Sequence, residues 1–109
     1  MAYDESLAQR IRQSLARKMG IEEKKMFGGI CFMLNGNFLV GVWKYSLIAR
    51  LGPEHGDEAL RGPHVREFDI TGRPMKGWVM VEREGVEDAD QVKDWIRRAS
   101  KFVGNLPAK

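Results

Sequence analysis

The chain has two histidines and one cysteine, which are side chains that often ligate metals or act in catalysis. His55 and His64 each lack a second ligand at a metal-binding spacing such as HExxH or CxxC. The segment His55-Gly56-Asp57-Glu58 could hold a hard metal ion, but such a short acidic cluster is more typical of a solvated helix start. Cys31 lies in an apolar stretch, where a cysteine is usually a small core residue rather than an activated thiol. We therefore expect no catalytic residue, no metal ligand, no cofactor and no enzymatic activity.

Basic residues offer two further kinds of chemistry. Lys93, Arg97 and Lys101 recur every four positions and would line one helix face, where they could follow nucleic-acid phosphates. The net charge of only +3 also fits the alternative of a solvated helix face. Arg50 and Arg73 lie near expected strand ends, where they could hold an anion or a partner's carboxylate, unless they make ordinary surface ion pairs. Weak nucleic-acid binding and the sensing of a small anion or metabolite are therefore alternative functions.

Composition limits the class of protein. The 109 residues, 43% hydrophobic and 30% charged, predict one globular domain that covers the whole chain, residues 1–109. No apolar stretch is long enough to span a membrane, and the acidic start does not resemble a secretory signal. A lone cysteine forms no internal disulfide bond, which fits a reducing compartment. We expect a cytoplasmic protein without membrane contact.

The first half of the chain predicts a helix followed by three strands. Apolar residues recur every four positions from Leu7 to Met19, so we expect a helix that begins after Asp4 and ends at Gly20. From Glu22 to Leu51 the apolar period is two, which predicts antiparallel strands with a bulge or bend at Gly28-Gly29.

Two short turns would join these strands. Asn35-Gly36 accepts positive φ at both turn positions and predicts a type I′ hairpin, and Lys44-Tyr45-Ser46 offers a second turn. The two-residue loop at Asn35-Gly36 predicts a register that pairs Met33 with Phe38, Phe32 with Leu39, and Cys31 with Val40.

The second half predicts a short helix, two strands and a long helix. Their expected positions are 53–60 for the short helix, 65–70 and 77–82 for the strands with a turn at 71–74, and 88–104 for the long helix, which has capping-box spacing at its start. The fold class is therefore α+β. We expect a two-layer sandwich of about five antiparallel strands with helices on one face, in the order α-β-β-β-α-β-β-α.

Both faces of this predicted sheet are apolar, although three helices can cover only one of them. At about 25 cal/mol per Å², leaving the other face wet would cost several kcal/mol and favour aggregation. We expect a homodimer, or another protein partner, on that face; the alternative is strong coiling, by which helices and loops cover both faces. The candidate interface consists of Cys31, Met33, Phe38, Val40, Val42, Val79 and Val81.

Several motifs together resemble the TfoX N-terminal-domain family, which includes the N-terminal half of bacterial competence regulators. They are Met26-Phe27-Gly28-Gly29, Asn35-Gly36-Asn37, Arg50-Leu51-Gly52, Phe68, Thr71-Gly72-Arg73-Pro74-Met75-Lys76-Gly77-Trp78-Val79, Trp95 and Leu106-Pro107-Ala108-Lys109. The resemblance implies a two-layer fold with an antiparallel sheet, similar to secretion-chaperone-like proteins that often dimerise. It also implies a bacterial cytosolic protein without an established enzymatic activity. The leading hypothesis is a small non-enzymatic interaction domain, a transcriptional co-regulator or adaptor.

Overall fold

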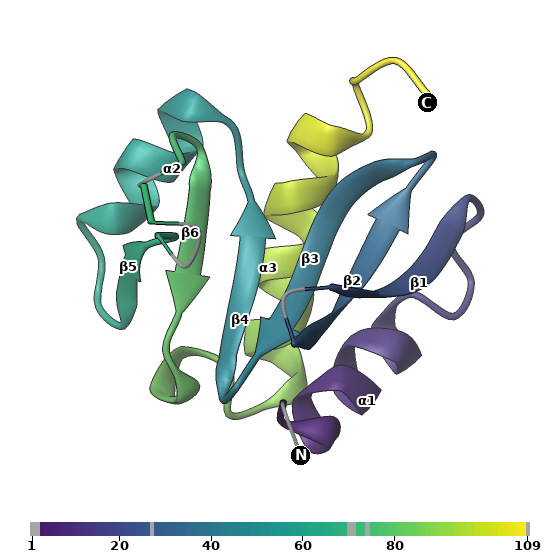
Figure 1. Ribbon diagram of the computed structural model, residues 1–109, viewed down its shortest axis with the longest axis horizontal. Coiled ribbons are helices and arrows are strands. Elements are labelled where there is room, and N and C mark those ends of the chain that lie inside the picture. Colours follow the sequence, from purple (N-terminus) through teal and green to yellow (C-terminus); the bar gives the residue numbers. More distant parts are fainter. Residues whose placement is uncertain (1–2, 27, 70–71, 74, 109) are drawn as a thin grey trace.

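The computed structural model of the protein describes residues 3–26, 28–69, 72–73 and 75–108. In this part of the chain the strands form one antiparallel sheet in the order β1-β2-β3-β4-β6-β5, with helices packed on it (Figure 1). The α+β class and the antiparallel two-layer arrangement are thus confirmed. The elements are α1 (Glu5–Ser14), β1 (Ile21–Met26), β2 (Gly29–Leu34), β3 (Asn37–Trp43), β4 (Ser46–Arg50), α2 (Pro53–Leu60), β5 (Val65–Glu67), β6 (Trp78–Val81), the 3₁₀ turn η1 (Arg83–Gly85) and α3 (Ala89–Val103).

The described residues form six strands rather than the expected five, because the chain reverses at the glycine pair. Met26 pairs with Gly29 in an antiparallel ladder, and Gly28 has a φ of +76°. The expected bulge or bend is therefore a hairpin, and Ile21–Met26 becomes a separate edge strand. Four of its six residues are charged, which protects an exposed edge from pairing with other chains.

The β2–β3 hairpin has the predicted turn but a different register. Asn35 and Gly36 have φ of 53° and 85°, as a type I′ turn requires. A bulge between Phe32 and Met33 leaves Leu39 unpaired, so that Phe32 pairs with Val40, one residue beyond the predicted partner. An extra residue in one strand moves every later side chain of that strand to the other face.

Helix α3 has the predicted ends, whereas α1 is shorter than predicted. Asp88 and Gln91 exchange both bonds of a capping box at the start of α3, and Gly104 is its C-cap. Helix α1 begins after the predicted cap Asp4 but ends at Ser14, six residues before Gly20. Leu15 is the last residue of the apolar stripe that reaches the core, while Met19 is 89% exposed. The strand predicted at 65–70 ends at Glu67, and residues 70, 71 and 74, which belong to the predicted strand end and turn, lie outside the described residues.

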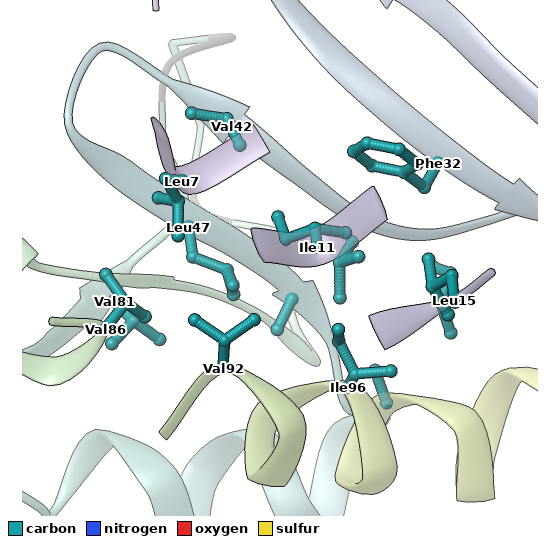
Figure 2. Packing of buried hydrophobic residues seen from close by; sticks show 14 of the residues in the cluster. Leu7, Ile11, Leu15, Phe32, Val42, Leu47, Val81, Val86, Val92 and Ile96 are labelled. Carbon is teal, nitrogen blue, oxygen red and sulfur yellow. The ribbon is translucent and has the colours of Figure 1, made fainter. Parts of the chain in front are cut away.

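The main core lies between the sheet and helices α1 and α3 (Figures 1 and 2). Its labelled members in Figure 2 are Leu7, Ile11, Leu15, Phe32, Val42, Leu47, Val81, Val86, Val92 and Ile96. This core also contains four residues of the candidate interface, which the structure therefore places on the helix side of the sheet. They are Val40, Val42, Val79 and Val81, each at most 1% exposed. Val40 and Val42 changed faces through the bulge, and β6 pairs Val79 and Val81 with Ala49 and Leu47 of the same core.

The second face of the sheet is covered by the chain itself. Phe68 and Met75, which precede β6, pack there in one cluster with Ile48, Met80 and Phe38. Phe68 is 1% and Met80 0% exposed. The other members of this second-face cluster are Cys31, Met33, Trp43 and Trp78. A connecting segment thus covers part of the sheet face that the helices leave open. This agrees with the alternative in which helices and loops together cover both faces.

This coverage reduces the bare apolar face from which a homodimer was inferred, and leaves Met33, Trp43, Met75 and Trp78 partly exposed. In the described part of the chain, the large hydrophobic side chains that are exposed are Met19, Met26 and Tyr45, which do not belong to the second-face cluster. The homodimer stays a prediction, which sedimentation velocity at micromolar concentration tests. Among the described residues, no helix has the length and apolar character needed to cross a membrane.

Candidate functional site

The exposed side of α3 carries the basic stripe that the sequence predicts. Lys93, Arg97 and Lys101 are all exposed, while Val92, Ile96, Ala99 and Val103 on the opposite side are buried in the main core. A helix rises about 1.5 Å per residue, so the three cations follow one another at steps of about 6 Å. Because the other face of α3 is buried in the core, the row of cations faces solvent.

Helix α1 and the turn after it supply the other wall of a cleft beside this row. The cleft, here called the α1–α3 cleft, has a volume of about 450 Å³. Lys18 contributes a fourth cation, and Ser14 and Ser100 contribute hydroxyl groups. No carboxylate is found among its described lining residues, which are Ser14, Leu15, Lys18, Lys93, Ile96, Arg97, Ser100 and Lys101.

The cations of the α1–α3 cleft differ in how far they are neutralised. Arg97 forms an ion pair with Asp94, and Arg98 pairs with the second oxygen of the same carboxylate at 3.0 Å. Lys18, Lys93 and Lys101 have no ion pair with any residue that the structure describes. Three ammonium groups therefore face solvent with their charge uncompensated at short range.

A groove of mixed charge runs along the other side of α3, between α3 and α2. One hollow of about 420 Å³ includes His55, Glu58, Arg97, Arg98 and Lys101. His55 Nδ1 lies 3.5 Å from a carboxylate oxygen of Glu58 on an exposed turn of α2. Because the carboxylate of Glu58 lies among the cations of this hollow, the hollow attracts anions less than the α1–α3 cleft does.

The two arginines of the predicted anion site have different surroundings. The guanidinium carbon of Arg50 lies 5.3 Å from the ring centre of Trp78 and 5.7 Å from that of Phe102, in the range of cation–π contacts. Arg73 is exposed in the segment that precedes β6. Arg50 therefore serves the packing of the sheet end, while the basic residues of the α1–α3 cleft come from the turn after α1 and from α3.

The residues considered for catalysis are far from an activated arrangement. Cys31 is 2% exposed, and burial raises the pKa of its thiol to about 11. His55 and His64 are exposed, and His64 has a φ of 64° in the turn before β5. Within the described ranges, no group of three or more His, Cys, Asp or Glu side chains could hold a metal ion.

Lys18, Ser14 and Ser100 are the cleft residues that sequence reasoning missed. The apolar stripe of α1 predicts which side of that helix is buried, and Lys18 lies on the polar side. Only the packing of α1 against α3 brings Lys18 opposite the row on α3. No local signal in the sequence reports that contact.

Fold and site together define a small α+β protein with an antiparallel sheet and a basic helix layer. The family model described as TfoX N-terminal domain matches residues 5–103, so the chain belongs to this family and is a competence-regulator-like domain. The resemblance seen in the sequence motifs is thereby confirmed. No curated protein and no solved structure matches the chain.

Proposed function

We propose that this protein is a regulatory interaction domain that acts without catalysis. It contacts its partner with the helix layer, by which we mean the surface formed by α1, the turn after it and α3. Membership of the TfoX N-terminal family supports the regulatory role, because this family is not known for enzymatic activity. The role we propose is that of a transcriptional co-regulator or adaptor. The observation that carries the proposal is the set of four cations around the acid-free α1–α3 cleft.

Burial of the apolar residues supports the choice of the helix layer over the sheet. Phe38, Ile48 and Met80 on the second face are at most 5% exposed, so the apolar side chains of that cluster that a partner could reach are the partly buried Met33, Trp43, Met75 and Trp78. The edge strand β1 carries two acidic and then two basic residues along Glu22–Lys25, and such charges disfavour the addition of a further strand. The side of α3 that borders the α1–α3 cleft, in contrast, carries charges of one sign, which are positive.

The test compares two charge-reversed forms of the protein as bait in the native extract. One form carries Lys93→Glu and Lys101→Glu in the helix layer, and the control carries Lys24→Glu and Lys25→Glu on β1, with the same change in net charge. We expect macromolecules captured by the wild type to be lost with the first form and kept with the second. Equal capture by both forms, or thermal stabilisation by a catalytic metal ion, would contradict the proposal.

A further inference from the structure

We infer that the α1–α3 cleft binds the phosphate backbone of duplex DNA without reading its sequence. This inference rests on the proposed function, since it names the partner that the helix layer contacts. Three features of the cleft support it: the linear arrangement of its cations, the freedom of its lysines from ion pairs, and the kind of side chain that lines it.

Three of the four cations form a row along α3. Lys93 and Lys101 are eight residues apart on α3, which places them about 12 Å apart along the helix axis, with Arg97 midway. Lys18 stands on the opposite wall of the cleft. A compact anion would contact one or two of these groups at a time. A chain of phosphates, whose charges also repeat along a line, can contact all four.

The lysines can bind phosphate without first losing a partner. Lys18, Lys93 and Lys101 make no ion pair in the described part of the chain, and the lining of the cleft holds no carboxylate. Each cation that contacts the backbone releases condensed counterions from DNA, and this release drives binding. Arg97 keeps its pair with Asp94 and still adds donors to the row.

The lining also indicates which form of nucleic acid fits. Leu15 and Ile96 form the floor of the cleft, and none of its described lining residues is aromatic. Single-stranded nucleic acids are usually held by bases stacked on aromatic rings. Lysine contacts to phosphate position a protein on DNA but carry no sequence information. The cleft is therefore suited to an intact duplex of any sequence.

The binding experiment uses fluorescence anisotropy with the full chain and a labelled duplex of about 20 base pairs. Four phosphate contacts predict a slope of about −3.6 for log K against log salt. Between about 50 and 200 mM NaCl the affinity should therefore fall about 150-fold. A second duplex of unrelated sequence should bind with the same affinity, and the single strand more weakly.

Matched variants test whether this cleft is responsible. Lys93→Gln and Lys101→Gln should each reduce the slope by about 0.9, because each removes one phosphate contact. The control Lys25→Gln removes the same charge from the exposed edge strand β1 and should leave the slope unchanged. All three positions are exposed, and circular dichroism checks that each variant keeps the fold.

Three results would overturn the inference: no binding at about 50 mM salt, an equal loss with Lys25→Gln, or tighter binding of the single strand than of the duplex. If DNA fails to bind while the helix-layer bait still loses a protein that the β1 control retains, the inference fails and the proposed function stands. If the two baits capture the same molecules, the proposed function fails as well.

Discussion

The side-chain amide of Asn37 donates a hydrogen bond to the backbone carbonyl of Pro107, with 2.9 Å between Nδ2 and the oxygen. The two residues are 70 positions apart in the chain. Asn37, the first residue of β3, is 3% exposed, and Leu106 next to Pro107 packs against the main core. The segment after α3 is therefore part of the fold, held to the β2–β3 hairpin by this partly buried hydrogen bond.

Replacing Asn37 should weaken the whole fold. Asn37→Ala leaves the carbonyl of Pro107 without this donor, and we expect a loss of about 1–2 kcal/mol in the free energy of unfolding. Urea denaturation followed by tryptophan fluorescence measures it. The matched control is Asn105→Ala, which removes an exposed bond from Asn105 to the carbonyl of Lys101 and should cost about 0.5 kcal/mol or less. Equal losses would show that the long-range bond contributes no more to the free energy of unfolding than the local bond of Asn105.

A pH-dependent ion pair holds the edge strand β1 to α1. The guanidinium of Arg12 donates two bonds to Glu23, at 3.0 and 2.9 Å, and these lower the pKa of the Glu23 carboxyl below its ordinary value of 4.5. A lowered pKa in the folded state stabilises the protein above the ordinary value, and this contribution is lost as the pH falls through the folded pKa. Both side chains are partly exposed, so we expect only about 0.5 kcal/mol.

The variant Glu23→Gln should therefore be less stable than the wild type near neutral pH and equally stable in acid, where Glu23 of the wild type is protonated. Denaturation curves across this pH range give the difference. Glu22→Gln is the control, because Glu22 is exposed and lies 3.9 Å from Lys24 in a loose pair. A stability difference for Glu23→Gln that is constant with pH would contradict the assignment.

The thiol of Cys31 should be unreactive in the folded protein. Burial raises its pKa to about 11, so on the order of one thiol in a thousand is ionised near pH 8. We expect a disulfide reagent that releases a coloured thiol to react slowly with the native chain and completely in concentrated guanidinium chloride. A rapid reaction in the absence of denaturant would show that the second face opens readily.

Gly77 allows β6 to approach the start of α2. Its φ is +88°, and a Cβ atom there would lie 2.8 Å from the backbone carbon of Gly52. Gly77→Ala adds this clash to the cost of a left-handed conformation, so we expect a loss of more than about 2 kcal/mol in unfolding free energy.

Gly72→Ala is the matched control for this substitution. Gly72 has a φ of +93° with open space around it, so only the conformational cost applies, about 1 kcal/mol. Thermal or urea unfolding of the two variants separates the effects. If both variants lose the same stability, close packing at Gly77 is not the reason for glycine there.

Local patterns predicted those parts of the fold that depend on neighbours in the chain. The capping box at Asp88, the turn at Asn35-Gly36 and the helix beginning at Pro53 appear as expected. Each of them depends on interactions within a few residues, which is the range over which sequence patterns are informative. The basic stripe of α3 was predicted for the same reason, since an amphipathic helix buries its apolar side.

Tertiary structure alone decided the remaining features. The bulge opposite Phe32 reversed the faces of Val40 and Val42, and nothing local in the sequence marks where a strand takes an extra residue. Burial of the second face depends on Phe68 and Met75, which reach the sheet only once the chain between β5 and β6 folds over it.

The class of fold, the ends of α2 and α3 and the row of cations on α3 could be predicted from the sequence, because short-range geometry governs all three. The position of Lys18 opposite α3 and the burial of the second sheet face depend on contacts between segments that are distant in the chain. Lys18 meets the row on α3 only because two helices pack together, and that packing is a property of the whole core.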